Sequence, residues 1–112
     1  MKRGEIYYAD LSPSIGSEIN KRRPVLIVSN NANNNAATTL TILPITSNAE
    51  RVYPFEIALT KKDSGLPKPS KAQAQQIRTI SKQRIKGKVQ GRLNKETMAL
   101  VDAALKLHLA LG

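Results

Sequence analysis

The stretches Arg23-Pro24-Val25-Leu26-Ile27-Val28 and Leu40-Thr41-Ile42-Leu43-Pro44-Ile45-Thr46-Ser47 decide the fold and the candidate site of this chain. The first begins with a guanidinium and is apolar at consecutive positions, which is typical of a strand buried on both faces. The second is an apolar strand that ends in two adjacent hydroxyls. If the two strands pair, a guanidinium and two hydroxyls converge at one end of a rigid sheet. Because arginine presents planar donors that match phosphate oxygens, this arrangement predicts a phosphate site.

The charge of the chain favours a polyanionic partner. Its 112 residues include 18 basic and 8 acidic side chains, for a formal net charge of +10. No carboxylate lies between Asp63 and Glu96, whereas basic residues recur there: Lys68, Lys71, Arg78, Lys82, Arg84, Lys86, Lys88, Arg92 and Lys95. Such a segment attracts nucleic acid first and an acidic protein second. The alternative is a basic surface that is merely solvated.

Length and composition limit the class of protein. We expect one domain over residues 1–112, with a core of Val, Ile, Leu and Ala. The chain has no cysteine, which excludes disulfides and thiolate chemistry. No apolar run reaches the roughly 20 residues that span a bilayer, and charged residues occupy the N-terminal positions that a signal peptide would keep apolar. We therefore expect a cytoplasmic protein without a membrane partner.

The hydrophobic pattern predicts a mainly β chain with a C-terminal helix. Strands are expected over residues 3–11, 24–29, 38–45, 55–59, 72–77 and 86–90. Between them we expect a helical turn near 81–84, an asparagine-rich turn over 30–35, and exposed loops over 12–22 and 61–70. Within 55–59, Phe55, Ile57 and Leu59 alternate with Glu56 and Ala58, which predicts a half-buried strand.

The last segment predicts a helix that begins after Asn94, a good N-cap, and carries Glu96 in its first turn. From Thr97 to Leu111, apolar side chains cover most of the circumference. A helix this apolar cannot lie on a monomer surface with a single buried face. It is either sunk in the core or packed against a second subunit. In a domain of this size we favour the second arrangement, a homodimer.

The residue types limit the chemistry available. Carboxylates are too sparse in the N-terminal half for a two-metal nuclease site, and His108 is the only histidine. We expect no metal and no cofactor. RNA supplies its own nucleophile, the 2′-hydroxyl, so an enzyme has mainly to align the attack and stabilise the charge on the phosphate. Arg23 suits this task, and Thr46 or Ser47 adds a hydroxyl. The alternative is that Arg23 is only an exposed charge.

The chain resembles the MazF/PemK toxin endoribonucleases. The motifs that carry the resemblance occur in family order: Arg3-Gly4-Glu5-Ile6-Tyr7, Asp10-Leu11-Ser12-Pro13, Gly16-Ser17-Glu18, Arg23-Pro24-Val25-Leu26-Ile27, Pro44-Ile45-Thr46, Tyr53-Pro54-Phe55-Glu56, Gln76-Ile77-Arg78-Thr79-Ile80 and the C-terminal helix. The resemblance implies an SH3-like β-barrel, a homodimer and metal-independent, sequence-selective cleavage of single-stranded messenger RNA that inhibits growth. The implied products carry 2′,3′-cyclic phosphate and 5′-hydroxyl ends, and the implied partner is an acidic antitoxin that competes for the basic groove.

By the same resemblance, Arg23 and Thr46 occupy the catalytic positions. Six further residues would line the RNA groove: Ser17, Glu18, Asn30, Ser47, Gln76 and Arg84. Glu18 has a plain alternative as a carboxylate that neutralises Arg22 or Arg23, and Gln76 as a strand residue that satisfies backbone donors. Many relatives carry a glycine pair shortly before the arginine, where this chain has Ile19-Asn20-Lys21-Arg22.

Two other functions fit the resemblance or the charge. The same fold hosts a gyrase poison that acts through a tryptophan-containing tail, but this chain has no tryptophan. A non-catalytic RNA-binding barrel would explain the charge and the small sheet. That reading leaves the arrangement of Arg23 and Thr46 as coincidence.

Overall fold

The computed structural model describes residues 1–12, 16 and 21–112, and the fold is given for those residues. Its elements in chain order are β1 (Glu5–Asp10), β2 (Arg22–Ile27), α1 (Asn31–Ala36), β3 (Thr39–Thr46), β4 (Glu56–Leu59), α2 (Lys61–Ser64), β5 (Ser70–Gln73), the 3₁₀ helix η1 (Ala74–Gln76), β6 (Arg78–Ser81), the 3₁₀ helix η2 (Lys82–Arg84), β7 (Ile85–Arg92) and α3 (Lys95–His108). The predicted mainly β architecture with a C-terminal helix is confirmed.

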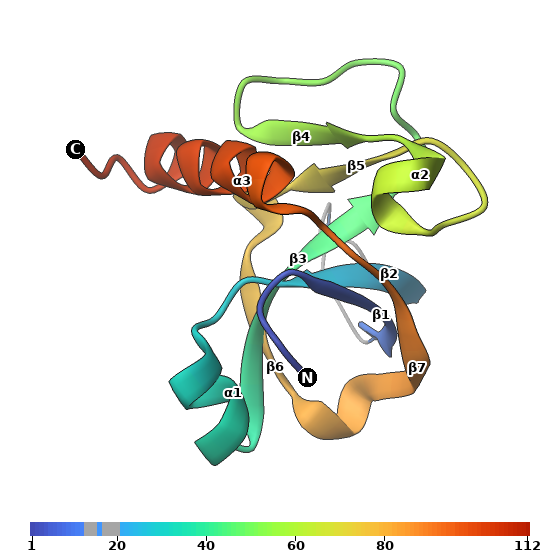
Figure 1. Ribbon diagram of the computed structural model, residues 1–112, viewed down its shortest axis with the longest axis vertical. Helices are drawn as coiled ribbons and strands as arrows, with labels where there is room; N and C mark the ends of the chain where they lie inside the picture. The colour runs from blue at the N-terminus through green and yellow to red at the C-terminus, as the bar shows by residue number, and fades with distance from the viewer. Residues whose placement is uncertain (13–15, 17–20) are drawn as a thin grey trace.

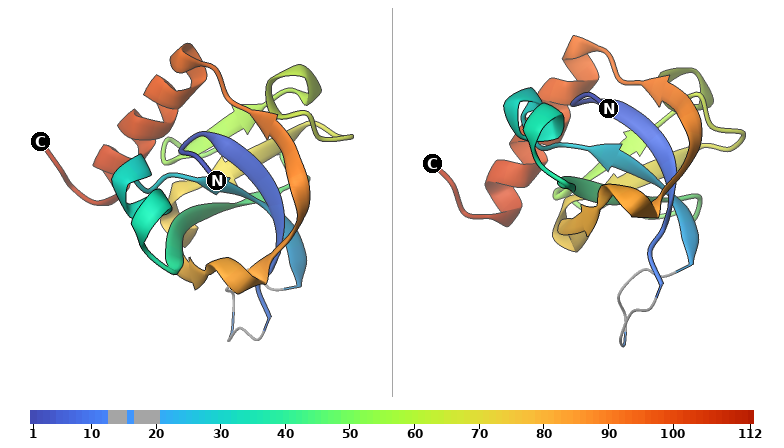
Figure 2. Two further views of the ribbon diagram at one scale, coloured as in Figure 1. Left: turned by 60° about the horizontal axis from the view of Figure 1, so that its bottom comes forward. Right: turned by 90° about the horizontal axis from the view of Figure 1, so that it is seen from below.

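The strands form one antiparallel sheet in the order β4-β5-β3-β2-β1-β7, and β6 pairs with β3 off this path. Strands β1, β2, β3, β6 and β7 curve around one half of the molecule, whereas β4, β5 and α3 occupy the other half (Figure 1). Figure 2 shows β1, β2, β3 and β7 wrapped around a common interior. Within the described ranges no pairing joins β6 to β7, so the ring of strands is not closed.

Strand β2 is central, as its apolar run predicts. It pairs with β1 on one side and β3 on the other. Val25 and Ile27 are fully buried in one apolar cluster, and Leu26 is fully buried in a second cluster on the opposite face. A strand covered on both faces holds its backbone rigidly, so the residues at its end have fixed positions.

Strand β3 links the two halves of the sheet. Its first part pairs with β6, from Thr39↔Ser81 to Ile42↔Arg78, and its last two residues pair with β5. The final pair is Thr46↔Lys71. The end of β3 is therefore held by a neighbouring strand, and Thr46 belongs to the sheet and not to a loop.

Helix α3 leaves much of its apolar surface exposed. The Asn94 side chain accepts from the N–H of Thr97 at 2.8 Å and begins the helix, as predicted. Val101 is fully buried, but Leu100 is 60% and Leu107 56% exposed. The described part of the chain contains no helix long and apolar enough to cross a membrane. The exposed outer flank that the sequence predicts for this helix is thus present.

Three predicted segments differ from the structure because local hydrogen bonds act there. Residues 31–35 are not a turn but belong to α1, since the Asn30 side chain caps the helix at the N–H of Asn33. The predicted loop 61–70 contains α2, which a capping box between Thr60 and Asp63 begins. The predicted strand 72–77 turns into η1 at Ala74.

Candidate active site

A pocket of about 160 Å³ opens at the end of the sheet where β1 ends and β2 begins. Its lining combines positive charge, hydroxyls and apolar side chains. The lining residues are Tyr8, Arg22, Arg23, Pro24, Ile45, Ser47, Leu66, Pro67, Lys68 and Ser70. This composition suits a ligand with an anionic group and a flat apolar part, which describes one nucleotide.

Strand pairing brings Arg23 to this pocket. The β1–β2 register sets Ala9 opposite Arg23, and the β2–β3 register runs from Ile27↔Ile42 to Val25↔Pro44. Arg23 and Thr46 each lie two residues beyond this last recorded pair, in strands that run antiparallel. The two side chains predicted to act together therefore belong to the same end of paired strands.

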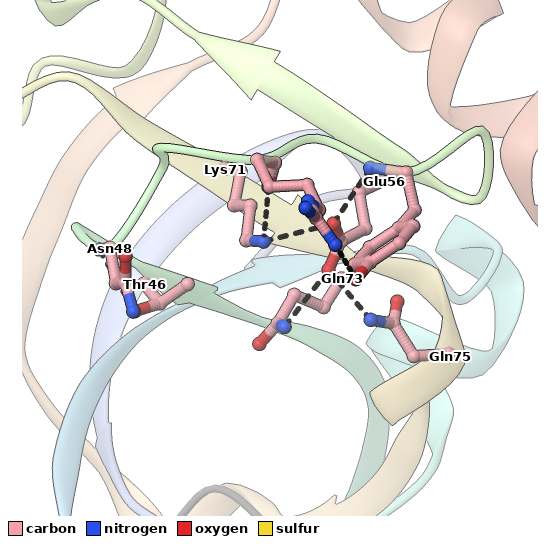
Figure 3. A network of polar contacts seen from close by, with 8 residues as sticks. Thr46, Asn48, Glu56, Lys71, Gln73 and Gln75 are labelled. Atoms are coloured by element: carbon pink, nitrogen blue, oxygen red, sulfur yellow. Dashed lines mark hydrogen bonds and ion pairs between the residues drawn. The ribbon is translucent and has the colours of Figure 1, made fainter.

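The two hydroxyl residues after Ile45 occupy different settings. Ser47 is exposed and lines the pocket. Thr46 is half-buried, and its neighbours in the chain, Ile45 and Ser47, both line the pocket. Its Oγ1 accepts from the N–H of Asn48 at 3.2 Å (Figure 3). A hydroxyl that accepts one bond retains its hydrogen for donation. Thr46 can therefore serve as a hydrogen-bond donor to an oxyanion.

A close approach between α2 and β7 sets the outer wall of the pocket. Helix α2 ends at Gly65, which has a φ of 74° and leads into Leu66, Pro67 and Lys68. A Cβ at Gly65 would lie 2.3 Å from the carbonyl oxygen of Gln90. Only glycine allows both the left-handed conformation and this distance. The wall therefore depends on backbone packing against β7.

Tyr8, Arg22 and Lys68 belong to the pocket, although sequence reasoning did not select them. The guanidinium of Arg22 lies over the Tyr8 ring, 5.6 Å from its centroid. Such a pair joins an aromatic face to a positive charge. The contact depends on the register between the strand that carries Tyr8 and the strand that carries Arg22. The sequence does not show this register, so it carries no signal for the contact.

A buried polar network lies next to the end of β3, because it includes Lys71, the strand partner of Thr46. The carboxylate of Glu56, only 6% exposed as a residue, accepts at Oε1 from Lys71 Nζ at 2.9 Å and from the Tyr53 N–H at 3.0 Å. Its Oε2 accepts from Gln73 at 3.0 Å and Gln75 at 2.6 Å. Lys71 also donates to the carbonyl oxygen of Arg51. Figure 3 shows these donors directed at Glu56.

This network keeps Glu56 ionised. Burial alone would raise the pKa of its carboxyl, but the donors from Tyr53, Gln75, Gln73 and Lys71 outweigh burial and lower the pKa to about 2. The alternation along residues 55–59 predicts that Glu56 lies on the exposed face of the strand. This prediction is wrong for Glu56, because the ion pair with Lys71 allows the carboxylate to be buried. Since Lys71 is the partner of Thr46 across β3 and β5, the ion pair supports the strand that carries Thr46.

Comparison with known proteins identifies the family. A family model for PemK-like, MazF-like toxins of type II toxin–antitoxin systems matches residues 2–109. The chain belongs to this family.

Relatives and solved structures agree with this assignment. The chain is 46% identical to the endoribonuclease MazF9 of Mycobacterium tuberculosis, over 99% of this chain and 98% of MazF9. It is 39% identical to the endoribonuclease EndoA of Bacillus subtilis, over 99% and 96% of the two chains. A mycobacterial endoribonuclease in complex with its cognate antitoxin is similar in fold, with a TM-score of 0.82 and 28% identity over 100% of this chain and 97% of that one.

The structure distributes the predicted site residues of this MazF-like toxin over several settings. Arg23 and Ser47 both line the pocket, whereas Thr46, which precedes Ser47 in the chain, is not among the lining residues. Asn30 is exposed and its side chain caps α1, and half-buried Gln76 lies in η1, outside the pocket lining. Arg84 binds backbone carbonyls near the end of β1.

Ser17 and Glu18 lie outside the described residues. Among the residues that the structure does describe, no three His, Cys, Asp or Glu side chains gather to form a metal site. The roles of all eight predicted residues in the MazF-like toxin stay predictions.

Proposed function

We propose that this MazF-like toxin, an endoribonuclease of a toxin–antitoxin system, cleaves single-stranded RNA by promoting attack of a ribose 2′-hydroxyl on the adjacent phosphate. The observation that supports the proposal is the pocket at the end of β2 and β3, which contains Arg23 and Ser47 beside Thr46. In it a planar cation and hydroxyl donors face one volume the size of a small ligand. This arrangement suits a phosphodiester.

The bond changes in this step follow from the substrate. The 2′-oxygen forms a bond to phosphorus and loses its proton, the bond from phosphorus to the 5′-oxygen breaks, and that oxygen gains a proton. The products are a 2′,3′-cyclic phosphate and a 5′-hydroxyl. Arg23 would stabilise the charge on the pentacoordinate phosphate, and Thr46 would donate a hydrogen bond. Arginine is a poor proton acceptor because its guanidinium stays protonated in proteins, so positioning and charge supply most of the rate enhancement.

The basic surface supports RNA and an acidic antitoxin as successive partners. The net charge of +10 attracts both, and each would neutralise the same cations. An acidic antitoxin bound over the groove would therefore displace RNA. The mycobacterial structural neighbour was solved with its cognate antitoxin, which favours this arrangement here. Cleavage of messenger RNA by the free toxin would arrest growth in the cytoplasm.

We also propose an SH3-like barrel that forms one domain and assembles as a homodimer. The exposed leucines Leu100 and Leu107 border a groove with Pro54, Ile57 and Ala58, and burial in a second subunit would remove this apolar surface from water. Light scattering should give twice the chain mass of 12.3 kDa. A monomeric mass at micromolar concentration would contradict the dimer.

Cleavage in a chelating buffer tests the function. The purified protein is incubated with a long single-stranded RNA in excess EDTA, and the product ends are mapped. We expect cuts at a short recurring sequence, with cyclic phosphate at the 3′ ends and hydroxyl at the 5′ ends. RNA binding without cleavage would support the binding-only alternative, and loss of cleavage in EDTA would indicate a metal mechanism.

A further inference from the structure

Arg84 makes hydrogen bonds that continue a strand ladder beyond its end. Strands β1 and β7 pair up to Ala9↔Ile85. Ile85 is the first residue of β7, so β7 has no further residue to pair with Asp10 and the residues after it. Arg84 Nη1 donates to the carbonyl oxygens of Asp10 and Ser12, at 3.0 Å and 2.5 Å. One guanidinium therefore replaces the backbone donors that a longer β7 would have provided.

The segment of residues 10–12 at the end of β1 makes further hydrogen bonds through Leu11. The N–H of Leu11 donates to the carbonyl oxygen of Lys21 at 2.9 Å. Arg78 Nη1 donates to the carbonyl oxygen of Leu11 at 3.3 Å. Three consecutive carbonyls at the end of β1 are thus bound by two arginine side chains. Leu11 itself is fully buried, so this segment forms part of the core.

This segment is paired directly with the strand that carries the proposed catalytic arginine. Asp10 is the partner of Arg22, and Ala9 is the partner of Arg23. Arg84 therefore contacts Asp10, and Asp10 and its neighbour Ala9 pair directly with Arg22 and Arg23. Movement of the end of β1 would move the backbone of Arg22 and Arg23, and with it one wall of the pocket.

We propose that Arg84 is a positioning residue, whose guanidinium holds the end of β1 against β2 and so fixes Arg23 in the pocket. This inference rests on the proposed function, in which Arg23 acts on the phosphate. It assigns Arg84 a task different from direct contact with RNA in the groove, which the family resemblance implies. Arginine suits the task because its planar donors have fixed directions, whereas lysine is a point charge with rotatable donors.

The experiment compares Arg84→Gln and Arg84→Lys with Lys62→Gln, which removes the same charge from an exposed residue of α2. We expect Arg84→Gln to lower the cleavage rate at saturating RNA by roughly ten- to a hundredfold, because small displacements in a site have effects of that size. RNA affinity and its salt dependence should match those of Lys62→Gln. Arg84→Lys should restore part of the rate, since lysine can reach one carbonyl.

Amide hydrogen exchange locates the effect in the structure. In Arg84→Gln the amides of Ala9, Leu11 and Arg23 should exchange faster than in Lys62→Gln, whereas those of β5 should not change. If Arg84→Gln fails to fold, Arg78→Gln provides the second variant, and it should act in the same direction with a smaller effect because it removes one hydrogen bond.

Two outcomes would overturn the proposal. A salt slope reduced by roughly 0.7 relative to Lys62→Gln, with an unchanged rate at saturation, would make Arg84 a phosphate contact. Faster exchange at Leu11 with unchanged cleavage would show that the segment does not position Arg23. Neither outcome bears on the role of Arg23 itself, which the Arg23 variants test separately.

Discussion

The variant Arg23→Ala is expected to cleave RNA about a hundred- to a thousandfold more slowly than the unchanged protein, because one donor to a developing oxyanion contributes on that order. Arg23 lines the pocket together with Ser47 and belongs to the strand end shared with Thr46. Its replacement removes the planar cation from the proposed phosphate position. Single-turnover cleavage of one RNA at saturating enzyme measures the effect on the chemical step.

Two matched variants separate a specific role of Arg23 from the local charge. Arg22→Ala removes the neighbouring cation, which lies over the Tyr8 ring, and should weaken RNA binding more than it slows cleavage. Arg23→Lys retains the charge but loses the planar donors, and should recover only part of the rate. An Arg23→Ala variant with the rate of the unchanged protein would refute the catalytic assignment. Equal losses in the two alanine variants would favour a solvated cluster of charges.

The variant Glu56→Gln is expected to lower the free energy of unfolding by about 3–5 kcal/mol, because it leaves the ammonium of Lys71 buried without its anion. The Glu56 side chain is 1% exposed and the Lys71 side chain 10% exposed. Urea denaturation at neutral pH measures the change. The exposed carboxylate Glu50 provides the control, since Glu50→Gln should change stability by no more than about 0.5 kcal/mol. Equal midpoints for both variants would contradict the role of the network.

The same carboxylate gives stability a defined pH dependence. Its pKa is about 2 in the folded protein, against 4.5 for the ordinary group. The unfolded chain therefore binds a proton more readily, so this contribution is complete above about pH 4.5 and is lost as the pH falls towards 2. The shift corresponds to about 3 kcal/mol. Stability of Glu56→Gln should vary less over this range, and identical pH profiles would contradict the lowered pKa.

The sequence predicted the parts of the fold that depend on apolar periodicity. The apolar runs at residues 25–28 and 40–45 form central strands because both faces are buried, and antiparallel pairing brings the start of one strand to the end of the other. Helix α3 begins at its predicted cap. These features need only local pattern and short-range pairing.

Sequence reasoning missed features that depend on contacts between distant residues. The burial of Glu56 requires Lys71, 15 residues further along the chain, and Gln75, 19 residues further along. The bonds of Arg84 join it to Ser12 across 72 residues. The pocket wall at Leu66 requires the close approach of Gly65 to Gln90. A charged or small residue gives no local sign of such a partner, so these contacts could not be predicted from the sequence.

Cleavage of an RNA with a single 2′-deoxy nucleotide on the 5′ side of a mapped cut tests most directly whether the substrate provides the nucleophile. In excess EDTA we predict that the unmodified RNA is cut at this position to a cyclic phosphate, and that the 2′-deoxy RNA remains intact there while other positions are cut normally. Cleavage at the deoxy nucleotide would show that water or a protein group attacks the phosphate, and would contradict the mechanism.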